Sequence, residues 1–134
     1  MNISILYGGT STEHKISIQT GLAVAEAVKD RYKLDLINLE AEIYNSPHLL
    51  LDTDLVFNAL HGGEGENGSI QAFLDLHHIP YTGSGSKACK IAMDKNITKL
   101  IAKSVYIPTP NWILLKRNQY TGIQLQDNQS PKFS

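Results

Sequence analysis

The sequence contains little cysteine and no long hydrophobic segment. Its 134 residues include one cysteine, Cys89, so no intrachain disulfide can form, and this favours a reducing compartment. No apolar run approaches the roughly 20 residues that a membrane-spanning helix needs. The N-terminus also lacks the basic segment of a secretory signal. We therefore expect a cytoplasmic protein that does not enter a membrane.

An excess of charge of either sign is also missing. Twelve Lys and Arg residues face thirteen Asp and Glu residues, for a net charge of −1. Such a balance gives no electrostatic reason to bind nucleic acid or an anionic membrane surface. The hydrophobic fraction of 42% and the charged fraction of 19% are typical of a globular protein with one ordinary core.

Strand-like and helix-like segments alternate along the first hundred residues. Runs of apolar and β-branched residues predict strands at 2–7, 33–39 and 54–60, and a brief extended segment at 79–82. Apolar residues at helical spacing predict helices at 15–29, 69–77, 87–93 and 94–105, the last two capped by Ser86 and Asp94. This alternation predicts an α/β fold with an open, mostly parallel sheet, whose strands end at one common edge.

The sequence changes character after Pro110. Residues 112–115 predict one more strand, which needs a sheet to join, whereas residues 118–134 are polar and lack apolar periodicity. A compact domain seldom ends in this way. The polar segment is either a disordered tail or the opening of a second domain that the chain leaves incomplete, and we favour the second interpretation.

A glycine-rich segment follows the third predicted strand. His61 precedes Gly62-Gly63-Glu64-Gly65-Glu66-Asn67-Gly68. Glycine at this density favours a loop whose backbone closely approaches a ligand, at the edge where open α/β sheets bind ligands. His61 is either a polar core residue or a ligand-orienting one. For Glu66 we favour a structural role, in which its carboxylate accepts backbone N–H groups within its own loop.

A second candidate segment, residues 8–14, follows the first predicted strand. Gly8 and Gly9 permit a sharp turn that leaves backbone N–H groups near a helix N-terminus. Ser11 or Thr12 either caps that helix or meets a ligand, and the Glu13 carboxylate is suited to a ligand ammonium group. We expect His14, the last residue of this segment, to be solvated. The segment lacks both the Gly-x-Gly-x-x-Gly dinucleotide pattern and the Gly-Lys-Ser/Thr phosphate loop.

A third candidate, Met93-Asp94-Lys95, lies between two predicted helices. A lysine in the first turn of a helix opposes the helix dipole. Lys95 is either an ordinary surface lysine or a functional one, and this local conflict favours a role such as pairing with ligand phosphates.

Together these motifs resemble the N-terminal part of the D-alanine–D-alanine ligase family. The His-Gly-x-x-Gly-Glu-Asn/Asp-Gly element is quite specific to this family, whereas Met-Asp-Lys recurs among ATP-grasp enzymes. Asn67 stands where many members have Asp. The matching segments, in the family's order, are 8–11 with Glu13, 59–68, 80–85, 93–95 and Pro108.

The resemblance implies a Rossmann-like, pre-ATP-grasp substrate domain over residues 1–92 and the truncated start of an ATP-grasp central domain over residues 93–134. It implies an ATP-dependent ligase that joins two D-alanines through an acylphosphate for cell-wall peptidoglycan synthesis. ATP and Mg²⁺ would be its cofactors, and D-alanine its substrate. It also implies a homodimer, to which the first helix contributes.

The resemblance also assigns site residues. Glu13 and His61 would be catalytic and would bind the substrate, together with Ser11, Gly62 and Gly63, and Lys95 would contact ATP phosphates. The family is about twice this length or more, and its magnesium-binding acids lie beyond residue 134. The resemblance thus implies no metal ligands in this chain and no activity of the chain alone.

Two other classes of function compete with the ligase. The first is a free-standing α/β module that binds a small amino acid or a nucleotide without catalysis. The second is a structural or interaction protein, which would need an exposed apolar stripe, and the sequence pattern indicates none.

Overall fold

The computed structural model describes residues 1–39 and 47–115. Its contacts divide the chain into two compact units, residues 1–98 and residues 99–134, and each is described by itself. Among the described residues, no helix is both long enough and apolar enough to cross a bilayer.

The first unit is built on a parallel sheet in the order β2-β1-β3. Its strands are β1 (Asn2–Tyr7), β2 (Lys33–Asn38) and β3 (Leu55–Asn58). The three predicted strands are thus confirmed, the first with the predicted bounds and the other two shorter than predicted. β1 pairs with both neighbours, Ile3 opposite Leu34 and Leu55. As the central strand it is covered on both faces, which explains its almost continuous apolar sequence.

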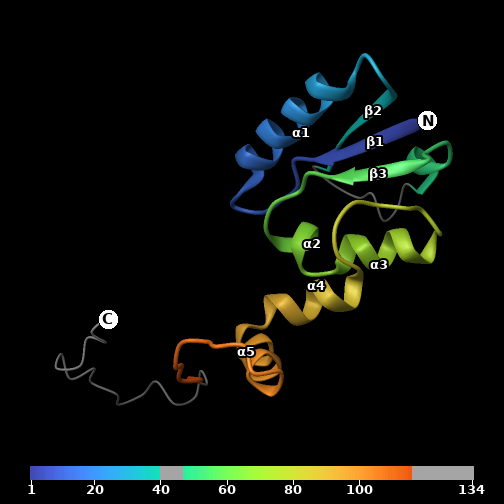
Figure 1. Ribbon diagram of the computed structural model, residues 1–134. Coiled ribbons are helices and arrows are strands. Elements are labelled where there is room, and N and C mark those ends of the chain that lie inside the picture. Colours follow the sequence, from blue (N-terminus) through green and yellow to red (C-terminus); the bar gives the residue numbers. More distant parts are fainter. Residues whose placement is uncertain (40–46, 116–134) are drawn as a thin grey trace. The chain divides into compact units, whose positions relative to one another are not determined.

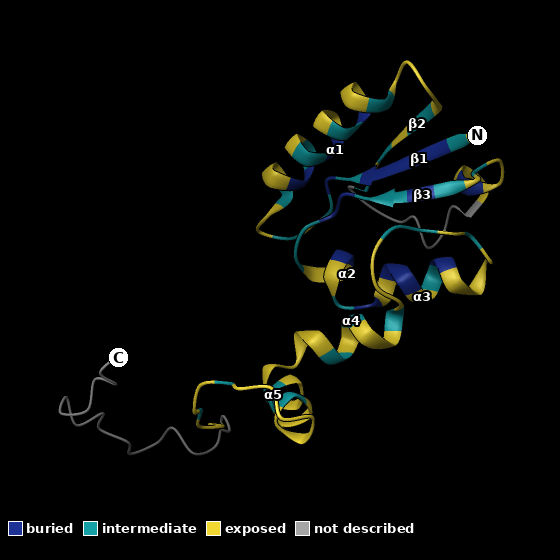
Figure 2. Cartoon of the chain, in the orientation of Figure 1, coloured by how far each residue is buried: buried dark blue, intermediate teal, exposed yellow. Residues whose placement is uncertain are grey.

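Helices cover both faces of this sheet (Figure 1). The first face packs against α1 (His14–Val28) in a core cluster, whose members are Ile3, Ile5, Ala25 and Ala59. The second face packs against α3 (Ser69–Leu76) in another cluster, whose members are Leu6, Leu50, Val56, Leu60, Ile70 and Leu74. Successive side chains of β1 therefore enter opposite cores, as the strand period of two requires. Figure 2 shows buried residues along β1 and on α3, whereas most of α1 is exposed or intermediate.

Shorter elements complete the first unit. They are a 3₁₀ helix (Pro47–Leu50), α2 (Gly63–Glu66), α4 (Ser86–Met93) and the start of α5 (Lys95–Ser104). The predicted extended segment at 79–82 is confirmed, because Tyr81 forms a parallel bridge with Val56 beside β3. The predicted cap of the last helix is also confirmed, since Asp94 Oδ1 accepts the Ile97 N–H at 3.0 Å. The predicted Ser86 cap is wrong, because α4 begins at Ser86 itself.

In the second unit, two expectations are wrong. Residues 112–115 form no strand, because no strand among residues 99–115 is available to pair with them. Instead the Trp112 ring lies 5.3 Å from Lys99 Nζ and 5.4 Å from Lys103 Nζ, within cation–π range. Large apolar side chains are also exposed, among them Leu100, Ile101 and Val105, contrary to the expected absence of such a surface. The polar segment 118–134 lies outside the described residues.

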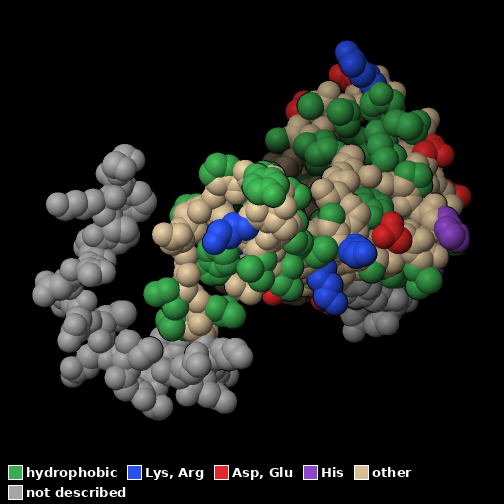
Figure 3. Space-filling model, turned by 60° about the horizontal axis from the view of Figure 1, so that its bottom comes forward, with side chains coloured by type: hydrophobic (Ala, Val, Ile, Leu, Met, Phe, Trp, Pro, Cys, Tyr) green, Lys and Arg blue, Asp and Glu red, His purple; other side chains and the backbone are tan. Residues whose placement is uncertain are grey.

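Hydrophobic side chains are prominent on the face of the molecule that Figure 3 brings forward. In α4 and at the start of α5, Met93 and Ile97 are exposed to 46% and 42%. Apolar side chains on these helices are therefore exposed, whereas the apolar side chains Ile70 and Leu74 of α3 lie in the core. The helical spacing predicted the helices correctly but not the burial of their apolar sides.

Tyr81 makes the stability of the first unit sensitive to alkaline pH. Its hydroxyl donates to Asp75 Oδ1 at 2.9 Å. Burial, then the hydrogen bond and the charge of Asp75, raise the pKa of Tyr81 above its ordinary value. The folded state therefore holds this proton more tightly than the unfolded state. Its contribution is complete below the unfolded pKa of about 10 and is lost as the pH rises further.

We expect the free energy of unfolding to fall less steeply between about pH 9.5 and 11.5 in Tyr81→Phe than in the wild type, as measured by urea denaturation. Tyr106→Phe is the matched control, because Tyr106 is 94% exposed. It should retain the wild-type slope. Parallel pH profiles for Tyr81→Phe and the wild type would contradict this role.

Candidate functional site

Three ionisable side chains from three segments meet beside the ends of β1 and β3. Glu13 precedes α1, His61 follows β3, and Glu66 is the last residue of α2. One ligating atom from each lies within 4.8 Å of the other two. The prediction that Glu13 and His61 share one edge of the sheet is confirmed. Glu66 joins them, and the sequence pattern did not reveal this.

Ser11 connects the two segments that carry Glu13 and His61. Its hydroxyl donates to the His61 carbonyl oxygen at 2.5 Å and accepts the Glu13 N–H at 3.1 Å. The interpretation of Ser11 or Thr12 as the cap of α1 is wrong, because Glu13 occupies the cap position and makes no side-chain cap bond. The Ser11 hydroxyl is instead part of the local framework of the site.

Helix α1 adds two more hydroxyl contacts to the chain that follows β3. Ser17 Oγ is fully buried and donates to the Ala59 carbonyl oxygen at 2.8 Å. Thr20 Oγ1 lies 3.0 Å from His61 Nε2. Residues three apart on a helix share a face, so Ser17 and Thr20 both point toward the same segment. That spacing was the available signal for these residues, and the sequence interpretation missed it.

The turn that leads into α1 is held by a histidine. His14 Nδ1 lies 2.7 Å from the Gly9 carbonyl oxygen, and the side chain is half-buried. The expectation that His14 is solvated is therefore wrong. Gly8 and Gly9 have φ values of +83° and +81°, in the left-handed region where glycine is favoured. The paired glycines thus serve a tight turn, as their position indicated.

The predicted glycine loop is largely a short helix, since Gly63–Glu66 form α2. Close backbone approach occurs just before it, at Gly62, whose φ is +64°. A Cβ at this position would lie 3.3 Å from both Glu13 Oε2 and Ser11 Oγ. Glycine therefore keeps the space beside Glu13 open. The substrate contacts expected for Gly62 and Gly63 remain predictions.

Glu66 does not act as a loop acceptor. Across residues 1–39 and 47–115, its carboxylate forms no hydrogen bond or ion pair, so the interpretation as a self-contained loop contact is wrong. Two exposed carboxylates and an imidazole converge, and no Lys or Arg of residues 1–39 or 47–115 is paired with them. Such an arrangement attracts a small cation that can donate several hydrogen bonds.

Mg²⁺, whose ligands the resemblance places beyond residue 134, does not fit this group. Mg²⁺ takes oxygen ligands in octahedral geometry, whereas one of the three donors here is an imidazole nitrogen. An alkyl ammonium group suits the set better, because its three N–H donors can meet acceptors from all three side chains. Within the described part of the chain, no other group of His, Cys, Asp and Glu is close enough to share an ion.

The remaining predicted residue, Lys95, is exposed at the first position of α5. In the described residues it forms no hydrogen bond or ion pair with Glu13, His61 or Glu66. Its predicted contact with phosphates remains a prediction.

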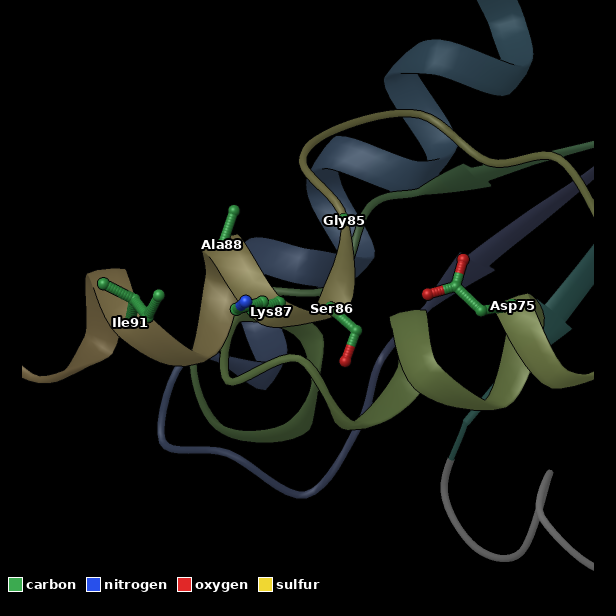
Figure 4. A pocket seen from close by; sticks show the side chains of 6 residues that line it. All are labelled: Asp75, Gly85, Ser86, Lys87, Ala88 and Ile91. Carbon is green, nitrogen blue, oxygen red and sulfur yellow. The ribbon is translucent and has the colours of Figure 1, made fainter.

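The first unit also has surface pockets, and the linings of two of them are as follows. One, of about 470 Å³, has Asp75 of α3 facing residues of α4 (Figure 4). Another, of about 410 Å³, includes Glu66, Gln71 and Cys89 in its lining. Neither is lined by Glu13 or His61, so Glu66 is the one member of the converging group that borders either of these two pockets.

Comparisons with known proteins agree on one family. A family model described as "D-ala D-ala ligase N-terminus" matches residues 38–84. The D-alanine–D-alanine ligase of Coprothermobacter proteolyticus is 42% identical over 114 residues, which cover 84% of this chain and 38% of that protein. The ligase of Fusobacterium nucleatum is 47% identical over 111 residues, which cover 82% of this chain and 39% of that protein.

Solved structures give the same result. The structure of D-alanine–D-alanine ligase from Bacillus anthracis complexed with ATP matches with a TM-score of 0.78 and 38% identity, covering 84% of this chain and 37% of that chain. The Coxiella burnetii ligase matches with a TM-score of 0.78 and 26% identity, covering 91% of this chain and 47% of that chain. This chain thus spans less than half of the length of these relatives, and it corresponds to the N-terminal portion of the D-alanine–D-alanine ligase family.

Proposed function

We propose that this chain is the substrate-binding N-terminal portion of an ATP-dependent D-alanine–D-alanine ligase of cell-wall synthesis. The division into a substrate domain at residues 1–92 and the opening of an ATP-grasp domain at residues 93–134 is part of the proposal. So are a cytoplasmic location and a homodimer, the latter supported by the exposed Ile16 and Leu22 of α1. The observation that carries the proposal is the convergence of Glu13, His61 and Glu66.

The bound group is the ammonium of the first D-alanine. The two carboxylates and one imidazole nitrogen offer acceptors for its three N–H donors. Glycine at position 62 leaves the side of Glu13 open for the rest of the amino acid. Backbone groups of Gly62 and Gly63 then lie beside the small side chain of the substrate.

This binding mode decides which end of the first substrate reacts. An ammonium held by carboxylates keeps its proton and is not a nucleophile, so this D-alanine reacts through its carboxylate. In the proposed reaction, that carboxylate attacks the γ-phosphorus of ATP, and ADP leaves. The free amine of a second D-alanine then attacks the acylphosphate carbon, and inorganic phosphate leaves with the bonding electrons.

ATP and Mg²⁺ are cofactors that we assign to the longer ligase of which this chain is the N-terminal portion. The ATP complex of the Bacillus anthracis relative supports an ATP-dependent reaction. The exposed Lys95 is our proposed phosphate contact, on the basis of its Met-Asp-Lys motif. Mg²⁺ supplies charge neutralisation of phosphates in such reactions. No residue of the described part is assigned to it.

The test is binding of D-alanine to the 134-residue chain, followed through the histidine side-chain resonances in NMR titrations. We expect D-alanine to shift the His61 ring signals saturably, and L-alanine to do so more weakly. We also expect no D-alanine-dependent ADP release in a coupled assay. Unshifted His61 signals at saturating D-alanine would refute the ammonium site. Dipeptide formation by the purified 134-residue chain would refute the proposal that catalysis needs the further domains of the ligase family.

A further inference from the structure

His61 is held by a side chain that the sequence motifs do not include. Its ring nitrogen Nε2 lies 3.0 Å from Thr20 Oγ1, in the middle of α1. Both side chains are half-buried, so water competes less for this hydrogen bond than it would at an open surface. The other ring nitrogen, Nδ1, has no hydrogen-bond partner among residues 1–39 and 47–115.

We propose that Thr20 is the residue that positions the His61 imidazole for substrate binding. The inference rests on the proposed function, in which His61 accepts from the ammonium group of D-alanine. An imidazole turns about two side-chain bonds, and ordering it on ligand binding costs conformational entropy. A hydrogen bond made before the ligand arrives removes part of that cost.

The position of Thr20 in the fold makes this contact rigid. Ser17, one turn earlier, is bonded to Ala59 O, two residues before His61. Ser11 Oγ is bonded to His61 O. The backbone of His61 and the helix that carries Thr20 are thus fixed relative to each other, so the hydroxyl of Thr20 stays within reach of the ring.

A hydroxyl is also the right chemical group for this task. It can donate to an unprotonated Nε2 or accept from a protonated one, so it orients the ring in either tautomer. A carboxylate in its place would favour one protonation state and add a third negative charge to the group. Thr20 therefore directs the ring while Glu13 and Glu66 supply the charge.

The test compares Thr20→Val with Thr20→Ser in the full 134-residue chain. Valine keeps the branched shape and the restricted χ1 of threonine but removes the hydroxyl, whereas serine keeps the hydroxyl. Two quantities are measured: the ¹⁵N shifts of the His61 ring, assigned with His61→Asn, and the dissociation constant of D-alanine.

We expect Thr20→Val to shift the Nε2 resonance and to weaken D-alanine binding about tenfold, the loss that one unsatisfied hydrogen bond produces. Thr20→Ser should restore both to near the wild-type values. Unchanged ring shifts and affinity in Thr20→Val would overturn the proposal, as would a serine variant that behaves like valine. A role in helix packing alone would leave the ring shifts unmoved.

Two further outcomes are decisive. If the wild-type chain binds no D-alanine, the proposed function fails, and the ring shifts alone decide the role of Thr20. If Thr20→Val does not fold, the wild-type ring decides. A nuclear Overhauser effect between the Thr20 side chain and the His61 ring protons next to Nε2 supports the contact with Thr20, and its absence overturns it.

Discussion

Replacing Glu13 with glutamine is expected to weaken the binding of D-alanine by about 10- to 100-fold, because a hydrogen bond to a charged group is worth about 1.5–3 kcal/mol. Glu13 is one of two carboxylates in the converging group, and the glutamine amide has the same shape without the charge. The dissociation constant is measured by NMR titration or calorimetry on the 134-residue chain.

The matched control is Glu64→Gln, which makes the same change on α2 at a residue outside the converging group. It should leave the dissociation constant within about twofold, because Glu64 supplies no acceptor to the converging group. The stability of the variant distinguishes a carboxylate that binds the ligand from one that supports the fold. Because Glu13 stands near Glu66 and no cation of the described residues is paired with it, Glu13→Gln should not lower the urea midpoint. An unchanged affinity for D-alanine in Glu13→Gln would refute the ammonium site.

Replacing Gly68 with alanine is expected to lower the free energy of unfolding by about 2–5 kcal/mol, the sum of a left-handed backbone cost and a core overpacking cost. Gly68 is buried, with φ at +91°, where it precedes α3. A Cβ there would overlap the carbonyl oxygen of Ser86 and lie 3.4 Å from Lys90 N. Both atoms belong to the backbone of α4, so the helix itself would have to shift.

Gly83→Ala isolates the first of these two costs. Its φ is +105°, but nothing lies within 4 Å of the position that a Cβ would take. We expect this control to lose only about 1–2 kcal/mol in urea denaturation. Equal losses in the two variants would contradict the close approach of α4 to the start of α3.

The sheet and its main helices could be predicted because each has a strong local signal. β1, β2 and β3 are short apolar segments between turn residues, and α1 and α3 carry apolar residues at helical spacing. The strand predicted at 112–115 shows the limit of such signals. Its apolar residues favour a strand, but strand pairing needs a partner, and none is available among residues 99–115.

The residues of the candidate site that lie in a recognisable motif could be predicted from the sequence. The contacts between residues of different segments were harder to predict. Glu13 and His61 stand at the ends of predicted strands, so topology alone places them at one edge. Glu66 was assigned to its own loop, because the glycines around it disfavour the short helix that turns it toward Glu13. Thr20 bonds a residue 41 positions away, a contact that depends on how α1 lies on the sheet.

Three alcohol groups, those of Ser11, Ser17 and Thr20, join the segment that carries His61 to α1 and to the turn before it. Alcohols do not ionise in the physiological range, and their bonds respond little to dissolved salt. Ionic strength should therefore change how strongly the converging carboxylates attract a cation, while these three connections between the segments stay the same.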